Sequence, residues 1–312
     1  MTCRGLFHSD VSSARVAAPA PAAMRFAPTT RQQRAWLAVV LTATSFVIGG
    51  TASSAAQTAT AEISVRRASE RTSFSDAEIK DGFFKTAFRA ELQFDRRAER
   101  IRKFDEPVRV FVTDGGASER SAQIAAVVAD IRARVDHLDL AMTNDRPAAN
   151  LVVTLVPQRD LSRTIRTRYG ADKAKQIQRS LDPQCLSGIA KDRSYRIRRS
   201  EVILPADADD FSFYDCAYEE LLQALGIIND DSSVPWTMFN DDVQMGFFDV
   251  YDQYLVNILY DPCVRPGMTK DEVNKLLPQV LPAVRTWVAD RNPRKDADAT
   301  APKDSAATLP SN

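Results

Sequence analysis

The residues most suited to chemistry lie in one short segment, 216–226, whose apolar residues recur at helical spacing. Glu219 and Gln223 are four residues apart, so they share one face of the expected helix. Glu220 points about 100° away from Glu219 around the helix axis. Gly226 is suited to the left-handed position that follows a helix. Two carboxyl groups and an amide are thereby gathered on one helix.

Paired carboxyl groups in a cleft could serve as general acid and general base and hydrolyse a glycosidic bond without a metal. Because Glu219 and Glu220 diverge, only one of them is expected to face such a cleft. The second carboxyl would then come from a neighbouring segment. The sequence does not choose among Asp215, Asp230, Asp231, Asp241 and Asp242.

Oxygen donors on the two segments after this helix raise the question of a hard cation such as calcium. The spacing of these donors is not that of an EF-hand loop. Asp241 and Asp242 are explained equally well as the first residues of a helix over 243–260. We therefore predict no metal or other cofactor, with calcium as the open alternative. The donors are Asp230, Asp231, Asn240, Asp241 and Asp242.

The spacing of segment 216–238 resembles the metzincin zinc-protease motif, in which His-Glu-x-x-His is followed by Gly, a third His and a turn with Met. None of the three His positions holds a histidine here, and a catalytic zinc needs three good donors. The resemblance therefore implies a zincin-like pseudoenzyme and excludes an active zinc protease. The matching positions hold Glu219, Glu220, Gln223, Gly226, Asn229 and Met238.

Without a metal, the polar groups at these positions need other partners, because buried polar groups are almost always paired. We expect Glu219, Gln223 and Asn229 to form a hydrogen-bonded cluster. His137 lies within a separate predicted helix and is expected to be an ordinary surface or packing residue.

The region from Cys185 to Thr269 also resembles a proteobacterial envelope family known as domain of unknown function 2927. The resemblance implies a location in the cell envelope and brings no activity with it. The segments that carry it are 185–188, 216–220, 223–226, 238–242, 257–262 and 265–269.

The order of secondary structure predicts an α/β (α+β) domain over residues 74–290. Strands are expected at 108–112, 150–156 and 201–204, and a long amphipathic helix at 118–142 separates the first two. This order is typical of a crossover that packs a helix on a sheet. With the zincin resemblance, we expect a twisted mixed sheet packed against helices and a helical C-terminal part. The other predicted helices are 75–90, 216–226, 243–260 and one that starts at Thr269 with a capping box.

The N-terminal region is typical of a secretory signal peptide, residues 1–56, with Met24 as an alternative start of translation. Three arginines precede the apolar run 35–50, and small residues around Ala56 suit cleavage there. Residues 57–73 are expected to form a flexible leader, and 291–312 a disordered tail. The mature chain would be periplasmic or secreted. The alternative is an inner-membrane anchor formed by an uncleaved segment 35–50, although this run is short for a span.

Cysteine usage fits an oxidising compartment. Cys185 and Cys216 flank the third predicted strand, and a disulfide between them would stabilise the fold by about 3–4 kcal/mol on the chain-entropy estimate. With Cys3 removed in the leader, Cys263 is expected to be free. A metal site built from Cys185, Cys216, Cys263 and His137 is disfavoured, because no two of the cysteines have Cys-x-x-Cys spacing.

Charge does not identify a partner, because the chain has 41 basic and 41 acidic residues. A basic stretch over 161–199 lacks the interleaved aromatic residues that single-strand binders use, so nucleic acid is excluded as a partner. Membrane contact is expected only transiently, through the signal segment. We expect a secreted domain that binds a peptide, a protein or an envelope polymer in the former substrate groove. The alternative is a hydrolase of an envelope polymer that uses Glu219 or Glu220.

Overall fold

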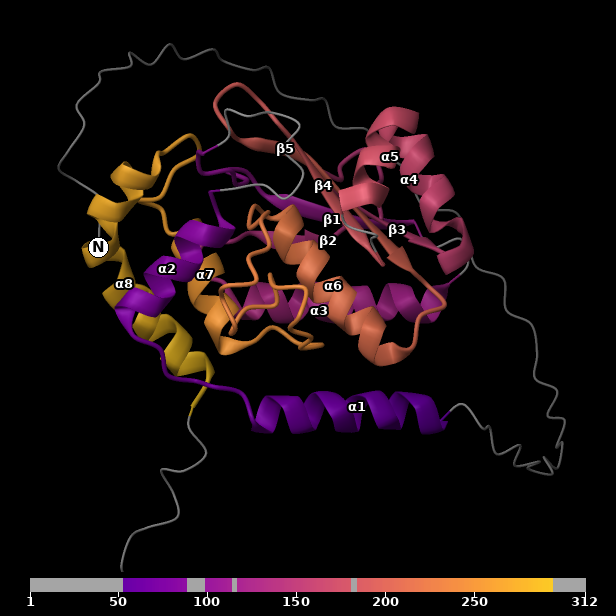
Figure 1. Ribbon diagram of the computed structural model, residues 1–312, viewed down its shortest axis with the longest axis horizontal. Coiled ribbons are helices and arrows are strands. Elements are labelled where there is room, and N and C mark those ends of the chain that lie inside the picture. Colours follow the sequence, from indigo (N-terminus) through magenta and orange to yellow (C-terminus); the bar gives the residue numbers. More distant parts are fainter. Residues whose placement is uncertain (1–52, 89–98, 114–116, 181–183, 294–312) are drawn as a thin grey trace, which may run out of the picture. The chain divides into compact units, whose positions relative to one another are not determined.

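The computed structural model describes residues 53–88, 99–113, 117–180 and 184–293 (Figure 1). Its centre is one five-stranded mixed sheet with the strand order β2-β1-β3-β5-β4. Strands β2, β1, β3 and β5 are parallel to one another, and the edge strand β4 runs antiparallel to β5. The predicted α/β class is therefore confirmed. The strands are β1 (Val108–Thr113), β2 (Leu140–Met142), β3 (Leu151–Val156), β4 (Leu186–Lys191) and β5 (Ile197–Pro205).

The three predicted strands correspond to β1, β3 and β5, whose runs of Val, Ile and Leu suit strands that are covered on both faces. The sequence did not predict β2 and β4. Strand β4 holds Ser187 and Gly188 and has Ile189 as its single β-branched residue, so its propensity for a strand is weak. It pairs from Leu186↔Ile203 to Lys191↔Ile197, with an irregularity between Ala190 and Lys191.

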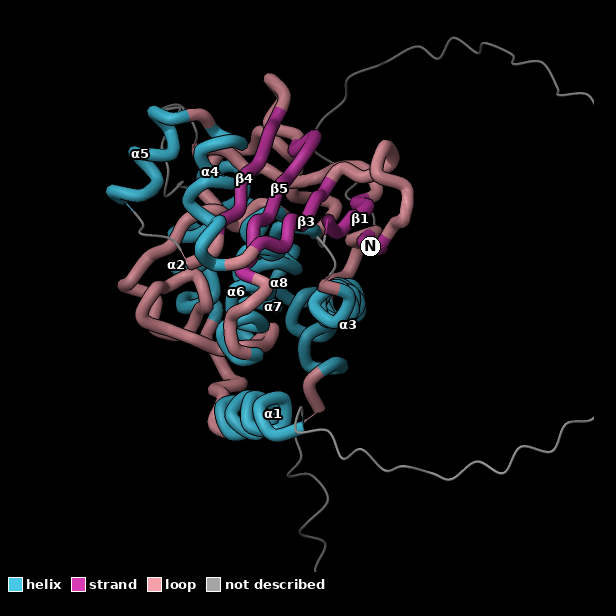
Figure 2. Tube along the Cα trace, turned by 90° about the vertical axis from the view of Figure 1, so that its right-hand side faces the viewer, coloured by secondary structure: helices cyan, strands magenta, loops and turns pink. Residues whose placement is uncertain are grey.

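Helices cover both faces of the sheet (Figure 2). A small core of Leu161, Ile165, Ala174, Ile177, Leu186 and Ile203 fixes α4 and α5 to one face. The main core lies on the other face, beneath α3 and α6, and continues into α2, α7 and α8. The helices are α2 (Asp76–Thr86), α3 (Ser118–Arg134), η1 (Gln158–Asp160), α4 (Leu161–Tyr169), α5 (Ala171–Ser180), α6 (Asp210–Ala224), α7 (Val250–Tyr260) and α8 (Lys270–Arg291).

The limits of several predicted helices are wrong. The helix expected over 216–226 begins earlier, at Asp210, and ends at Ala224. The helix expected over 118–142 ends at Arg134, because Val135 is extended and His137 has a positive φ of 58°. The buried side chains beyond Arg134 therefore belong to a turn and to β2. The helix expected over 243–260 begins at Val250. Its N-cap is Asp249, so Asp241 and Asp242 are not its first residues.

The capping box predicted for the last helix is confirmed. The Thr269 hydroxyl accepts a hydrogen bond from the backbone N–H of Glu272, and the Glu272 carboxylate accepts one from the N–H of Thr269 at 2.7 Å. Ser75 and Glu78 form the same reciprocal pair at the start of α2. Each pair satisfies donors that helix formation leaves without a partner.

A further helix, α1 (Ser53–Ala68), covers most of the segment for which the sequence predicted a flexible leader. Arg66 donates a hydrogen bond to the carbonyl of Gln244 at 2.7 Å and lies over the ring of Phe211. Arg67 lies over the ring of Phe247. The apolar segment 35–50, which the sequence predicts to belong to a signal peptide, lies outside the described residues. Among the helices that are described, none has both the length and the apolar character needed to cross a bilayer.

Helix α6 has strong signals at both ends. Its N-cap Asp209 accepts a hydrogen bond from the N–H of Ser212 at 3.0 Å. After the helix, Gly226 has a φ of +126°, a conformation that residues with a side chain rarely adopt. A Cβ atom at Gly226 would lie 2.2 Å from the carbonyl oxygen of Arg102. Glycine is therefore required at this position both for its backbone conformation and for the close approach of another chain segment.

We predict that Gly226→Ala destabilises the protein more than Gly170→Ala does. Both glycines have positive φ, and a left-handed or extended positive-φ alanine costs about 1–3 kcal/mol at either position. Only at Gly226 does the new methyl collide with backbone, since nothing lies within 4 Å of a Cβ at Gly170. The collision should add about 1–3 kcal/mol. Urea denaturation measures the free energy of unfolding of both variants. Equal decreases in this free energy would contradict the close approach at Gly226.

Candidate functional site

A cavity of about 570 Å³ lies where the edge strand β4 faces α6. One wall is segment 184–190, which includes most of β4, and the other carries a stripe of α6 side chains. The rest of the lining comes from α4 and α5, from residues 199–201 of β5 and from parts of the segment 228–244. The cavity therefore lies at the edge of the sheet, between the covers of its two faces.

The α6 stripe consists of Cys216, Glu219, Glu220 and Gln223, all of which line the cavity. Their spacing of three, one and three residues places them along one side of the helix. The expectation that only one of the two glutamates faces a cleft is therefore wrong. They diverge around the helix axis, but the cavity is wide enough to include both.

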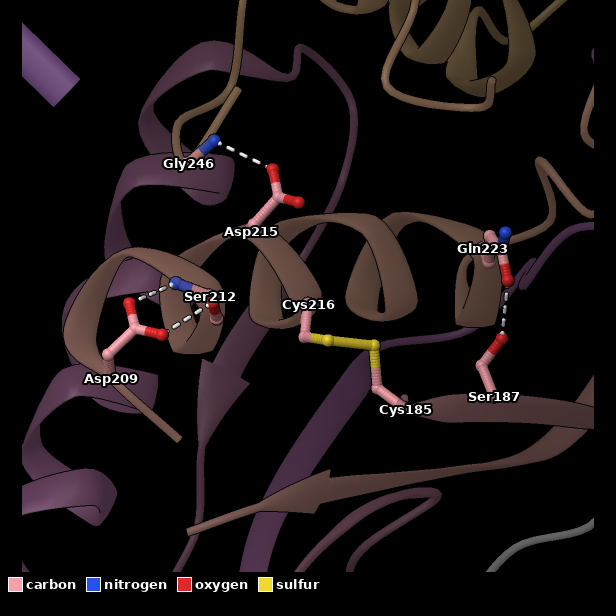
Figure 3. The surroundings of a disulfide bond; sticks show 8 residues. All are labelled: Cys185, Ser187, Asp209, Ser212, Asp215, Cys216, Gln223 and Gly246. Carbon is pink, nitrogen blue, oxygen red and sulfur yellow. Dashed lines mark hydrogen bonds between the residues drawn. A yellow bond between two sulfur atoms is a disulfide. The ribbon is translucent and has the colours of Figure 1, made fainter. Parts of the chain in front are cut away.

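The predicted disulfide Cys185–Cys216 is confirmed and joins the segment before β4 to α6 (Figure 3). Ser187 of β4 lies two residues after Cys185, and its hydroxyl donates a hydrogen bond of 3.0 Å to the side-chain oxygen of Gln223. The two walls of the cavity are thus joined at two points. The expectation that Cys263 carries a free thiol is wrong, because Cys263 is also disulfide-bonded.

Three carboxyl groups meet in the cavity. Oxygen atoms of Glu219, Asp230 and Asp241 all lie within 4.8 Å of one another. The Gln223 amide nitrogen donates to both oxygens of Asp230, at 3.0 and 3.3 Å, and so orients that carboxyl toward α6. Such a group of oxygen donors suits a hard cation or a cationic side chain better than it suits zinc. Asp230 and Asp241 are among the residues that the sequence proposed as donors.

Electrostatics at Glu219 follow from this crowding. Burial, together with the neighbouring carboxyls of Glu220 and Asp230, raises the pKa of Glu219 well above its usual value. The Glu219 side chain keeps partial contact with solvent through the cavity. A positive charge bound beside Glu219 would lower the pKa of this carboxyl.

Asn229 does not join the cluster expected from the sequence. Its amide nitrogen donates to the carbonyl oxygens of Lys85 and Asp230, at 2.9 and 3.0 Å. Its backbone N–H donates to the carbonyl of Thr86 at 3.1 Å. Asn229 thus fixes the chain after α6 to the end of α2, and the partner of Gln223 is the next residue, Asp230.

Met238 lines the cavity, and its backbone is hydrogen-bonded to the buried carboxyl of Asp252. Its backbone N–H donates to Asp252 at 2.8 Å, and the Thr237 hydroxyl donates to the same side chain. Burial raises the pKa of Asp252 to about 6. Burial and the charge of Asp252 also raise the pKa of the adjacent Asp249 well above its usual value. Sequence patterns gave no sign of this pair, because both residues fall inside the helix that was expected over 243–260.

Three other candidates lie in different surroundings. The Asp215 carboxylate accepts hydrogen bonds from the N–H groups of Met245 and Gly246, at 2.7 and 2.9 Å, and burial raises its pKa. It lines the cavity but serves to hold the 245–246 turn. Asp242 is exposed and does not line the cavity. His137 lines a separate cavity and lies 3.2 Å from Asp136.

Tyr169 of α4 completes the side of the cavity opposite α6. Its ring lies over Gly188, where a Cβ atom would come within 2.3 Å of the Tyr169 hydroxyl oxygen. Burial and the nearby charge of Glu201 raise the pKa of this hydroxyl. Glycine in the middle of β4 is thereby explained by the close approach of an aromatic ring. Sequence reasoning had assigned no role to either residue.

Fold and cavity together define a class: a disulfide-bridged mixed α/β domain with an acidic cleft beside an antiparallel edge strand. Residues 76–279, about two thirds of the chain, match the family described as "Protein of unknown function (DUF2927)". The chain belongs to that family. No curated protein and no solved structure has significant similarity to it.

We predict that Glu219→Gln increases stability at high pH. Because the pKa of Glu219 is higher in the folded protein than its usual 4.5, the folded state binds the proton more tightly. Stability is therefore lost as pH rises from about 4.5 through the raised pKa. The glutamine variant lacks this loss, so its advantage should be largest at pH 8 and absent near pH 4. Urea denaturation across this range measures it.

Asp242→Asn is the matched control, since it removes an exposed carboxyl that does not line the cavity. It should change stability little at either pH. An identical pH dependence in the wild type and in Glu219→Gln would show that Glu219 is not the titrating group.

Proposed function

We propose that this protein is a binding module of the cell envelope, which takes up an extended peptide segment in the cleft beside β4. The observation that carries the proposal is the cavity itself, in which a sheet edge and a group of carboxyl side chains are accessible together. Edge strands present backbone N–H and C=O groups that can pair with another chain. Strand addition of this kind is a common mode of peptide recognition.

The outer edge of β4 is suited to this role. Strand β4 pairs with β5 on its inner side, and among the described residues no strand pairs with its outer side. All residues of segment 184–190 line the cavity, together with residues 199–201 of the neighbouring β5. A cavity of about 570 Å³ lies in the range of small-molecule and peptide sites. The backbone of the ligand would supply affinity, and the flanking side chains would supply selectivity.

The proposed relation to zincins supports binding without zinc proteolysis. The positions of the three zinc ligands in that motif hold Glu219, Gln223 and Asn229. The Asn229 side chain is hydrogen-bonded to the Lys85 carbonyl of α2. The donors that do converge are carboxylates and one amide, which are not the ligand set of a catalytic zinc site. A zincin-like ancestry in which the metal site was replaced by polar contacts is consistent with both facts.

The proposed location is the periplasm or the extracellular space. Two features support it: the predicted signal peptide over 1–56 and the disulfide that joins the cleft walls. In this proposal the chain reaches its ligand after export. A calcium ion is the alternative ligand for the three carboxyl groups of Glu219, Asp230 and Asp241.

A second candidate function, a metal-independent hydrolase of an envelope polymer, is favoured by one observation. Glu219, whose pKa is raised, lies beside other carboxyls in an open cavity, an arrangement in which a proton donor and a base can coexist. Purified peptidoglycan incubated with the protein tests this function through release of soluble fragments. Turnover that is lost in both Glu219→Gln and Glu220→Gln would replace the binding proposal.

We predict that peptide binding slows amide hydrogen exchange in β4. The probe is an equimolar mixture of capped nine-residue synthetic peptides of varied sequence, added to the full chain. Backbone amides of 186–191 that do not bond to β5 should become protected, because they would donate to the added strand. Amides in the middle of α8, which is remote from the cavity, serve as the internal control. Protection nowhere, or only in α8, would refute binding along β4.

A further inference from the structure

Positive charge is concentrated on the pair of helices α4 and α5. Segment 158–180 holds seven basic residues and two acidic ones, although the whole chain has 41 of each kind. The two helices lie side by side over one face of the sheet, where the small core buries their apolar residues (Figures 1 and 2). The rest of the chain therefore has more acidic than basic residues. The basic residues of the pair are Arg159, Arg163, Arg166, Arg168, Lys173, Lys175 and Arg179.

The outer side of α5 carries part of this charge. Ala174 and Ile177 are buried, and Lys175 and Arg179 lie on the opposite side of the helix, one turn apart and exposed. The residues of α5 that line the cleft are Lys173 and Ile177, so neither belongs to this outer side. A partner that covers Lys175 and Arg179 would therefore leave the cleft accessible.

The adjacent part of the pair continues the charge. On α4, Leu161 and Ile165 are buried, whereas Arg163 lies on the opposite side of the helix with 76 % of its side chain exposed. Arg166 is exposed on the same helix, and Arg159 is exposed in the preceding η1. The two helices and η1 thus present basic side chains to solvent together.

Four of these basic residues have no counter-ion within the described part of the chain. Arg163 is paired with Asp160 at 2.9 Å, and Arg168 with Glu201 at 3.1 Å, so their charges are compensated. The side chains that form no ion pair and no hydrogen bond among the described residues are Arg159, Arg166, Lys175 and Arg179. Their charge is available to a partner.

The surface suits a broad layer of negative charge better than one small anion. The shallow cavity beside Lys175 and Arg179 is lined by α5 residues alone, so α4 does not converge with them on one ligand there. None of the large apolar side chains exposed in the described structure belongs to segment 158–180. Attachment would therefore be electrostatic, without insertion of side chains into hydrocarbon, and would act over about 8–10 Å.

We infer that the outer side of α4 and α5 is a docking surface for the phosphate headgroups of an anionic lipid bilayer. Clusters of Lys and Arg adsorb to such bilayers, and each basic side chain near the surface strengthens adsorption about fivefold. Docking would hold the domain at a membrane of the envelope while the cleft stays open. The inference does not depend on the proposed peptide ligand, because none of the four uncompensated residues lines the cleft.

Co-sedimentation with lipid vesicles tests the inference on the full chain as the cell exports it. Vesicles of equal parts phosphatidylglycerol and phosphatidylcholine should bind the protein at low salt, and vesicles of phosphatidylcholine alone should not. Sodium chloride at about 0.5 M should release the protein, because salt shortens the range of the attraction. Equal binding to both kinds of vesicle, or binding that salt does not weaken, would overturn the inference and assign the contact to an apolar segment.

A triple variant locates the surface. Arg166→Gln, Lys175→Gln and Arg179→Gln together remove three of the four uncompensated charges. This variant should bind the anionic vesicles about 100-fold more weakly, which is the product of three fivefold effects. Because all three side chains are exposed, its circular dichroism spectrum should match that of the wild type.

The matched control removes the same charge from the helices of the main core. Lys80→Gln, Arg132→Gln and Lys275→Gln change exposed residues of α2, α3 and α8. The control should bind the anionic vesicles within about fivefold of the wild type. Equal effects of the two triple variants would show that net charge decides binding, and would overturn the assignment to α4 and α5.

A soluble polyanion is the other partner that such a surface could bind, and immobilised heparin is its probe. Retention on heparin without binding to the anionic vesicles would overturn the assignment to a bilayer. Failure of the vesicle test leaves the prediction of slowed exchange in β4 unaffected, because that experiment contains no lipid.

Discussion

The arrangement around α6 depends on the desolvation of its carboxyl groups and on the hydrogen bonds that compensate for it. Removing a carboxylate from water is costly unless hydrogen bonds or opposite charges replace its hydration. Here the replacements are mostly neutral donors. Asp215 receives two backbone N–H groups, Asp252 receives the N–H of Met238 and the hydroxyl of Thr237, and Asp230 receives the amide of Gln223.

These bonds also determine the course of the chain after α6. Each carboxyl collects donors from a segment that has no regular secondary structure, and it thereby fixes that segment against a helix. Asp215 holds the 245–246 turn to α6, and Asp252 holds the turn at Met238 to α7. The loops that border the cleft are therefore ordered by buried carboxyl groups, of which Asp215 also lines the cavity.

Sequence patterns were sufficient where local chemistry decides the structure. The apolar runs of β1, β3 and β5, the capping box of α8 and the Cys185–Cys216 bridge were all predicted and are confirmed. Each depends on residue types that act over a few positions or on a small number of cysteines. The α6 stripe was located for the same reason, because a helix converts spacing directly into a shared face.

The remaining features depend on contacts between distant segments. Strand β4 has weak propensity and exists because β5 pairs with it and Tyr169 covers its glycine. The start of α7 was misplaced because Phe247 and Phe248 are buried from a non-helical segment, which gives the same apolar signal as a helix. Gln223 pairs with Asp230 and not with Asn229, because the end of α2 takes the Asn229 amide. A spacing rule contains no information about that neighbour.

The bridge between Cys185 and Cys216 has a mechanical consequence for how the cleft can change its width. A covalent bond holds β4 and α6 together at one end, whereas two residues further along β4 the link is a single hydrogen bond from Ser187. That bond contributes about 1 kcal/mol and can break in a thermal fluctuation. At the other end of the cleft, the Ser200 hydroxyl of β5, which pairs with Ile189 of β4, donates to the Ala224 carbonyl of α6 at 2.7 Å. Reduction of the bridge would therefore leave the distance between β4 and α6 to hydrogen bonds and packing alone.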